Sequence, residues 1–115
     1  VKVQLSDNII ENVYAQMVAL PAGTSWESSI MAVGDIDEIR ANVVIRDLRT
    51  LHFEVVERYG SFDSIRHILG EATSNTISLG GIAKLIGGPS YYLRVTNTHS
   101  SDTTIRAIHE RRFIR

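Results

Sequence analysis

Apolar and polar residues alternate along this chain with the two-residue period of β-strands. The pattern is clearest in residues 89–98, where the inner positions are Tyr91, Leu93 and Val95. It also fills residues 39–46 and 51–58, with inner positions at Ile39, Ala41, Val43, Ile45, Leu51, Phe53 and Val55. Each segment would lie over a core on one face and meet water on the other. We expect residues 89–98 to form a central antiparallel strand, and 39–46 and 51–58 to form a hairpin closed by residues 47–50.

Weaker alternation marks further strands on both sides of this hairpin. Residues 1–5, 12–20 and 26–33 precede it, and residues 77–79 and 103–114 follow it. Short clusters of glycine, proline, serine, threonine and asparagine separate these segments, as is typical of turns. The glycine pairs at 80–81 and 87–88 belong to this class, and we interpret both as tight turns.

One further stretch fits a short helix, and a second is compatible with either a helical turn or a strand. In residues 61–69, Phe62, Ile65 and Leu69 recur at helical spacing. Ser61 is a suitable N-cap and Gly70 follows the last turn. Residues 81–86 form an apolar run too short for its period to separate one helical turn from a buried strand. We expect a short helix at 61–69, and both alternatives stay open at 81–86.

The order of these elements indicates the fold class. Short strands that follow one another at intervals of roughly ten residues, with turn residues between them, are typical of antiparallel sandwiches and barrels. The 115 residues of the chain suffice for one such domain. We therefore expect residues 1–115 to form a single, mainly β domain: an antiparallel β-sandwich or barrel-like sheet pair with one or two short helical turns.

Charge is nearly balanced over the whole chain but not between its halves. The net charge is -1, whereas residues 1–57 carry four basic and nine acidic side chains and residues 58–115 carry eight basic and four acidic ones. Halves that stayed apart in the fold would attract the opposite halves of other copies, head to tail. Arg106, Arg111 and Arg112 concentrate positive charge near the C-terminus, and arginine is enriched at protein interfaces.

The sequence also limits the cellular setting. It contains no apolar run of the ~20 residues that a membrane-spanning helix needs, and its first residues lack the pattern of a signal peptide. It has no cysteine, which excludes disulfides and thiolate metal sites. We expect a soluble protein without membrane insertion. The compartment stays open, and extracellular and virion-associated locations are both compatible with the sequence.

Sequence motifs of catalysis and cofactor binding are absent. Neither a Gly-x-Ser-x-Gly elbow nor a phosphate-binding glycine loop occurs. The acidic run at 34–38 lacks the glycine and the distal glutamate of a calcium loop. We expect no cofactor, no metal site and no enzymatic activity. Only two lysines and a slightly acidic balance argue against a nucleic-acid partner.

The leading hypothesis is a non-enzymatic structural or assembly module. Such a subunit, of the virion or cell-surface type, would associate with its own copies or with a structural partner protein. The contacts would come from edge strands and from the arginine-rich tail with Arg106, Arg111 and Arg112.

Two alternatives belong to other functional classes. One is a β-sandwich module that binds a carbohydrate or another small ligand through Trp26, Tyr91 and Tyr92, because flat aromatic rings on a β surface can stack on sugars. The other is an enzyme whose site the fold assembles from scattered carboxylates and histidines: His52, His67, His99 and His109.

Overall fold

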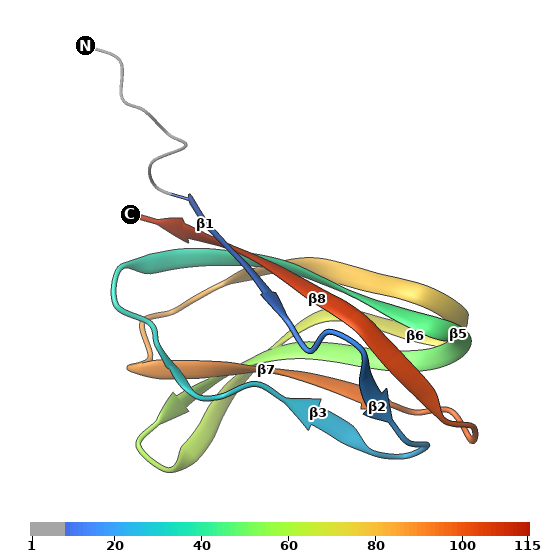
Figure 1. Ribbon diagram of the computed structural model, residues 1–115. Helices are drawn as coiled ribbons and strands as arrows, with labels where there is room; N and C mark the ends of the chain where they lie inside the picture. The colour runs from blue at the N-terminus through green and yellow to red at the C-terminus, as the bar shows by residue number, and fades with distance from the viewer. Residues whose placement is uncertain (1–8) are drawn as a thin grey trace.

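The computed structural model describes residues 9–115, which form eight β-strands (Figure 1). These are β1 (Ile9–Tyr14), β2 (Val18–Leu20), β3 (Ser25–Glu27), β4 (Met31–Ala32), β5 (Ile36–Tyr59), β6 (Phe62–Lys84), β7 (Ser90–Asn97) and β8 (Thr103–Ile114). All pairings are antiparallel, which confirms the mainly β, antiparallel fold class. The strand predicted at residues 1–5 lies outside the described residues.

One long bent hairpin organises the molecule. β5 and β6 have 24 and 23 residues and pair with one another along their length. Residues 36–45 of β5 pair with β8, whereas residues 51–58 pair with β7. The register of the β5–β6 ladder shifts between Val44, Arg49 and Leu51, and such irregularities let a strand bend without reversing its direction.

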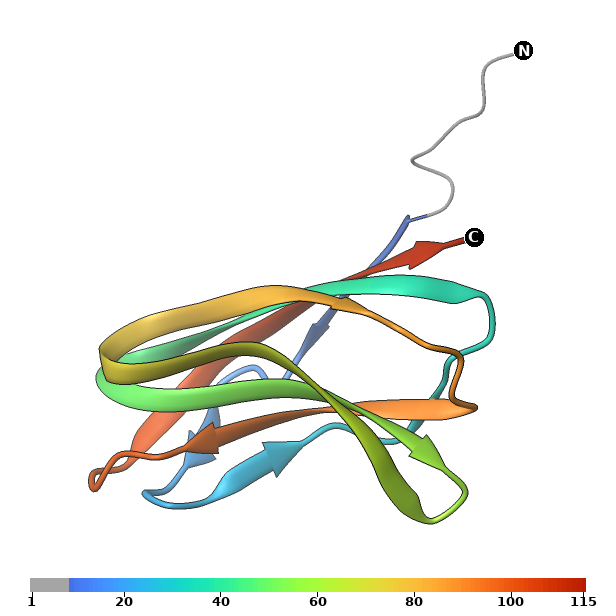
Figure 2. The same ribbon diagram turned by 180° about the vertical axis from the view of Figure 1, so that it is seen from behind.

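The bend folds one curled sheet into two layers, as both views of the ribbon show (Figures 1 and 2). We call one the β8 layer, which contains β1, β2, β8, residues 36–45 of β5 and the end of β6. The other is the β7 layer, which contains β3, β4, β7, residues 51–58 of β5 and the start of β6. The prediction of a sandwich-like sheet pair is therefore confirmed.

The core lies between the two layers and consists of the predicted inner faces. It includes Ile39, Val43 and Ile45 of the β8 layer and Phe53, Val55, Leu93 and Val95 of the β7 layer. Full burial of one such side chain stabilises a fold by about 1.5–3 kcal/mol. The alternation in residues 39–46, 51–58, 89–98 and 103–114 thus located the strands that carry most of the apolar burial.

Glycines allow the layers to meet at β6. A Cβ atom on Gly81 would lie 2.0 Å from the carbonyl oxygen of Leu69, which belongs to the same strand on the other side of the bend. A Cβ atom on Gly70 would lie 2.7 Å from Cγ of Leu79. A side chain at Gly81 would meet backbone and force the two halves of β6 apart, whereas one at Gly70 would displace the side chain of Leu79.

The helix predicted at 61–69 is wrong, because the structure has no helix within residues 9–115. Residues 61–69 lie in the hairpin turn and in β6, where Ile65, His67 and Leu69 face the interior in alternation. Pairing with β5 along the whole strand overrides the helical spacing of Phe62, Ile65 and Leu69. At 81–86, β6 continues to Lys84 and an irregular segment follows.

Several strand boundaries also differ from those predicted. Residues 39–46 and 51–58 are one strand rather than a hairpin, because residues 47–50 continue β5 through its bend. The segment 12–20 is split into β1 and β2 by left-handed backbone at Ala15 and Met17, with φ of 52° and 55°. Residues 26–33 hold two short strands, and the glycine pair 80–81 lies within β6 instead of a turn.

Candidate functional site

The three aromatic residues predicted to bind a ligand do not form one exposed surface. Tyr91 is 0% exposed and donates its hydroxyl hydrogen to Glu110 over 2.9 Å. Tyr92 is 5% exposed on the opposite face of β7 and donates to Asp63. Trp26 is partly buried against the core. These rings offer no shared flat face on which a sugar could stack.

The three arginines proposed for an interface lie in different surroundings. Arg106 is exposed on β8. Arg111 is also exposed and forms an ion pair with Glu11 over 2.9 Å. Arg112 points inward, where it binds Glu110 over 2.9 Å. The fold therefore uses two of the three arginines in contacts within the chain.

Similar pairs neutralise the charge asymmetry between the halves of the chain. Arginines of the second half bind carboxylates of the first: Arg111 with Glu11, Arg94 with Glu27, and both Arg66 and Arg94 with Glu54. The sheet interleaves the two halves, so the uneven distribution along the sequence does not by itself create two charged poles for head-to-tail association.

A buried acid organises the outer face of the β7 layer. Glu54 is 0% exposed, because Arg66 and Arg94 cover its carboxylate and His52 Nε2 lies 2.7 Å from its Oε2. Burial by itself raises the pKa of a carboxyl group, but the hydrogen bonds from these three side chains outweigh it and lower the pKa of Glu54 from 4.5 to about 2. The charged form of Glu54 thus holds two guanidinium groups in place.

This arrangement makes the stability of the fold sensitive to acid. A carboxyl group whose pKa is lower in the folded state stabilises the fold above its unfolded pKa of 4.5, and this contribution is lost as the pH falls toward 2. For Glu54 we expect a loss of roughly 3 kcal/mol of unfolding free energy, to be measured by urea denaturation between pH 6 and pH 2. Glu54→Gln should be less stable at pH 6 and should lose less stability on acidification.

A matched control is available beside this cluster. Glu71 is more than half exposed and lies 3.8 Å from Nδ1 of His52. Glu71→Gln removes one carboxylate without uncovering Glu54, so its acid profile should follow that of the unmodified protein. An acid profile of Glu54→Gln identical to that of Glu71→Gln would contradict the role given to Glu54.

Histidines and acids do meet in this fold, but in structural contacts. His67 Nε2 lies 2.6 Å from Oε2 of Glu57, which also accepts hydrogen bonds from the backbone N–H groups of Ile86 and Gly88. These contacts lower the pKa of Glu57 against the opposing effect of burial. Glu57 thereby fixes the irregular segment after β6. Glu54, the partner of His52, is likewise bound to two arginines.

Residues 9–115 contain no group of three histidine or carboxylate side chains placed to hold a metal ion. Nor does that part of the chain contain a helix long and apolar enough to cross a membrane.

The outer edge of β6 is a long unpaired strand edge of the described fold. Among residues 9–115, β6 pairs with β5 alone, so its other side is open along 23 residues. Residues 72–83 carry neither a charge nor a proline. On the strand, Ile77 and Ile82 are 48% and 54% exposed. Sequence analysis missed this edge because residues 61–69 were assigned to a helix, although the uncharged run itself was visible.

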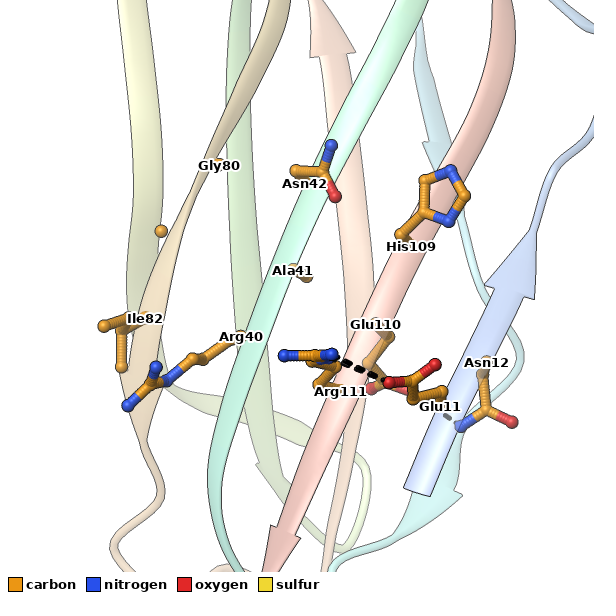
Figure 3. A pocket seen from close by; sticks show the side chains of 11 residues that line it. Glu11, Asn12, Arg40, Ala41, Asn42, Gly80, Ile82, His109, Glu110 and Arg111 are labelled. Atoms are coloured by element: carbon orange, nitrogen blue, oxygen red, sulfur yellow. Dashed lines mark hydrogen bonds and ion pairs between the residues drawn. The ribbon is translucent and has the colours of Figure 1, made fainter. Parts of the chain in front are cut away.

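The second candidate is a hollow of about 430 Å³ on the outer face of the β8 layer, which we call the trough (Figure 3). Strand pairing arranges its outward side chains in two rows across the sheet. One row contains Glu11, Arg111, Arg40 and Ile82; the other contains His109, Asn42 and Gly80, and is continued outside the trough by Val13. Outward positions for Arg40 and Asn42 follow from the predicted alternation, whereas their neighbours from β1, β6 and β8 depend on a register that the sequence does not reveal.

Comparisons with known proteins inform the fold. No family model matches the sequence, and a search of curated proteins finds no match. The structure resembles SPBc2 prophage-derived protein YomS, with a TM-score of 0.53 and 15% identity over 97% of each chain. It resembles part of a chain in the structure of infectious bursal disease virus, Gx strain, with a TM-score of 0.60 and 9% identity over 92% of this chain and 32% of the viral one.

A third neighbour belongs to another functional class. It is the CBM22-1 xylan-binding domain from Paenibacillus barcinonensis Xyn10C, with a TM-score of 0.50 and 15% identity over 93% of this chain and 82% of that domain. Identities this low show a shared β-sandwich fold and no common activity. Virus-derived and carbohydrate-binding neighbours occur together, so the comparisons are compatible with a structural and with a carbohydrate-binding role and do not decide between them.

Proposed function

We propose that this chain is a non-enzymatic assembly module, a subunit of a virion or cell-surface structure that joins a second copy of itself by strand addition along β6. The observation that carries the proposal is the open edge of β6, with its uncharged residues 72–83. An unpaired edge presents a row of backbone N–H and C=O groups that another strand can bind. Likeness in fold to a chain of a virus structure supports this class of function.

The backbone groups of the open edge are available at a defined position. Oγ1 of Thr76 lies 2.8 Å from the carbonyl oxygen of Ser78 and 3.3 Å from its nitrogen. Ser78 therefore directs both backbone groups away from β5, toward the open side. Because these directions alternate along a strand, Gly80 and Ile82 share this orientation. A docking strand would replace the side-chain contact of Thr76 with a regular ladder.

The other edges of the fold are poorly suited to strand addition. β3 and β4 have only three and two residues. β1 and β2 are separated by the left-handed residues Ala15 and Met17, which interrupt the edge. Short and interrupted edge strands are common protection against unwanted pairing, as are charges and prolines. Residues 72–83 of β6 lack charges and prolines over twelve consecutive residues, and this uninterrupted length distinguishes the edge from the short edge strands β2 and β4.

Two copies related by symmetry can complete the backbone hydrogen bonds of this edge. Strands of two β6 edges related by a two-fold axis would run antiparallel, each copy contributing the same surface. Neither partner brings a charge to residues 72–83, so pairing meets no like-charge repulsion there. Such pairing would join the sheets of the two copies into one.

Proline at Ser78 tests the proposal. It removes a backbone N–H that points to the open side and leaves the β5–β6 ladder intact. We expect light scattering across protein concentrations to show dimers or larger assemblies for the unmodified chain, and at least about tenfold weaker association for Ser78→Pro, since several ladder bonds are lost.

Ser78→Ala is the matched control. It removes the same hydroxyl group but keeps the backbone N–H, so its association should equal that of the unmodified chain. Urea denaturation of both variants checks that the monomer fold is intact. A chain that stays monomeric at millimolar concentration, or a Ser78→Pro variant that associates normally, would contradict assembly through β6.

A further inference from the structure

The trough on the β8 layer carries an unusual charge arrangement. Arg40 and Arg111 stand directly opposite one another on adjacent antiparallel strands. Like charges at opposed positions destabilise a sheet, and an exposed pair of arginines gains nothing from burial. Since the β5–β8 ladder is long and otherwise regular here, this juxtaposition needs a compensating partner.

The compensation within the chain is weak. Arg111 Nη2 lies 2.9 Å from Oε1 of Glu11, and the two side chains are 59% and 65% exposed. Nε of Arg40 lies 2.7 Å from Oε2 of Glu38, its neighbour two positions away on the same strand. An exposed pair such as Arg111–Glu11 contributes little to stability, whereas Glu38, the partner of Arg40, is only 14% exposed. Both arginine side chains are nevertheless more than half exposed, at 51% for Arg40 and 59% for Arg111, so each can also contact an external anion.

Gly80 gives the trough its depth. It lies opposite Asn42, where any other residue would extend a side chain over the face of the sheet. A Cβ atom at Gly80 would lie 2.6 Å from the carbonyl oxygen of Ala41, so the backbones are too close to accommodate one. The missing side chain exposes the amide of Asn42 and, beyond it, the imidazole of His109, as Figure 3 shows.

These groups match one class of ligand. Guanidinium groups bind carboxylates and sulfates through paired hydrogen bonds. The amide and the imidazole can each donate to and accept from hydroxyl groups. Ile82 and Val13 add exposed apolar surface at the two ends of the rows. We propose that the trough binds an acidic polysaccharide, a sugar chain with carboxylate or sulfate groups, with Arg40 and Arg111 holding the anion and Asn42 and His109 the hydroxyl groups.

A nucleic acid fits the same trough less well. Single strands are bound on positively charged grooves with exposed aromatic rings on which bases stack. Among the described residues, no phenylalanine, tyrosine or tryptophan lines the trough, and His109 supplies its single small ring. The nearby ring of Phe113 is already covered by Arg40, whose guanidinium carbon lies 4.7 Å from the ring centre. A sugar chain can be bound through hydrogen bonds alone, without aromatic rings for stacking.

The test is calorimetric titration with four polymers: polygalacturonate for carboxylate, dextran sulfate for sulfate, dextran as the uncharged control and single-stranded DNA for phosphate. We expect one or both acidic polysaccharides to bind, with affinity falling as salt is added, and dextran to be silent. Arg111→Ala and Arg40→Ala should each weaken binding about tenfold. Glu11→Gln should strengthen it severalfold, because it frees Arg111 from its partner.

Arg46→Ala is the matched control, since Arg46 is an exposed arginine of β5 outside the trough. It should bind as the unmodified chain does, and the NMR signals of His109 and of the Asn42 side-chain amide should shift on titration. Silence of both acidic polysaccharides, stronger binding of DNA, or equal losses for Arg46→Ala and Arg111→Ala would overturn the proposal. None of these results depends on association through β6, which Ser78→Pro tests separately.

Discussion

Gly81→Ala should destabilise the fold by about 3 kcal/mol, at the upper end of what one added methyl group causes in a packed interior. The new Cβ atom would lie 2.0 Å from the carbonyl oxygen of Leu69. This obstacle is backbone and cannot rotate away, so the two halves of β6 must separate and the layers must part at this edge. Urea denaturation should show a midpoint lowered by about 1–2 M.

Gly60→Ala is the informative comparison. Gly60 has a φ of 66° and no atom within 4 Å of the position of an added Cβ. Its replacement is disfavoured only by the left-handed backbone, which for an L-residue amounts to about 1–2 kcal/mol. If Gly81→Ala loses no more stability than Gly60→Ala, the layers are not in contact at β6 as the structure has them.

The sequence predicted the long strands in which alternate residues face the core. Residues 103–114 and 89–98 correspond to β8 and β7 with nearly the predicted boundaries, because regular alternation there coincides with a core on one side. Tyr91, Leu93 and Val95 face the interior as expected. A local pattern is sufficient where the physical cause, burial of alternate residues, is itself local.

The bend was beyond such reasoning. Residues 47–50, which are polar except for Leu48, and the polar residues 73–76 were both assigned to connections between strands, yet both continue their strands where the long hairpin changes layer. A polar interruption marks a break in burial, but whether the chain reverses or only bends depends on which strands pair on either side. In β5 the chain bends instead of reversing because its two halves pair with β8 and β7, which come later in the sequence.

The candidate sites, too, were predictable where a local pattern determines them and unpredictable where strand pairing does. Outward positions for Arg40, Asn42 and Arg94 could be inferred from alternation. Their neighbours could not, since Arg111 is brought beside Arg40, and Glu54 beside Arg94, only by the register between distant strands. The importance of Gly80 as the floor of a trough likewise requires the position of Asn42, because from the sequence alone the glycine pair resembled a turn.

Glu110→Ala should be the most destabilising change of a charged residue in this fold. Glu110 is 1% exposed and accepts hydrogen bonds from Tyr14 over 2.8 Å and from Tyr91 over 2.9 Å, while Arg112 lies 2.9 Å away. Burial and the nearby carboxylate raise the pKa of Tyr14 to about 12, so its hydroxyl group stays a donor. Without Glu110, the charge of Arg112 and two hydroxyl groups would be left in the interior.

A loss of about 3–5 kcal/mol is expected, as for other buried ion pairs that lose one member. Glu11→Ala is the control, because it breaks an exposed pair with Arg111 on the same two strands and should change stability by less than about 1 kcal/mol. The double variant Glu110→Leu/Arg112→Met removes both charges and should recover most of the lost stability.

If the double variant is no more stable than Glu110→Ala, the stability is lost through packing or through the tyrosine hydroxyl groups, and the charge of Arg112 does not require Glu110. Recovery of stability would instead show that Glu110 and Arg112 are tolerated in the interior because each neutralises the charge of the other. The two residues lie two positions apart on the same face of β8, so the sequence alone places them side by side.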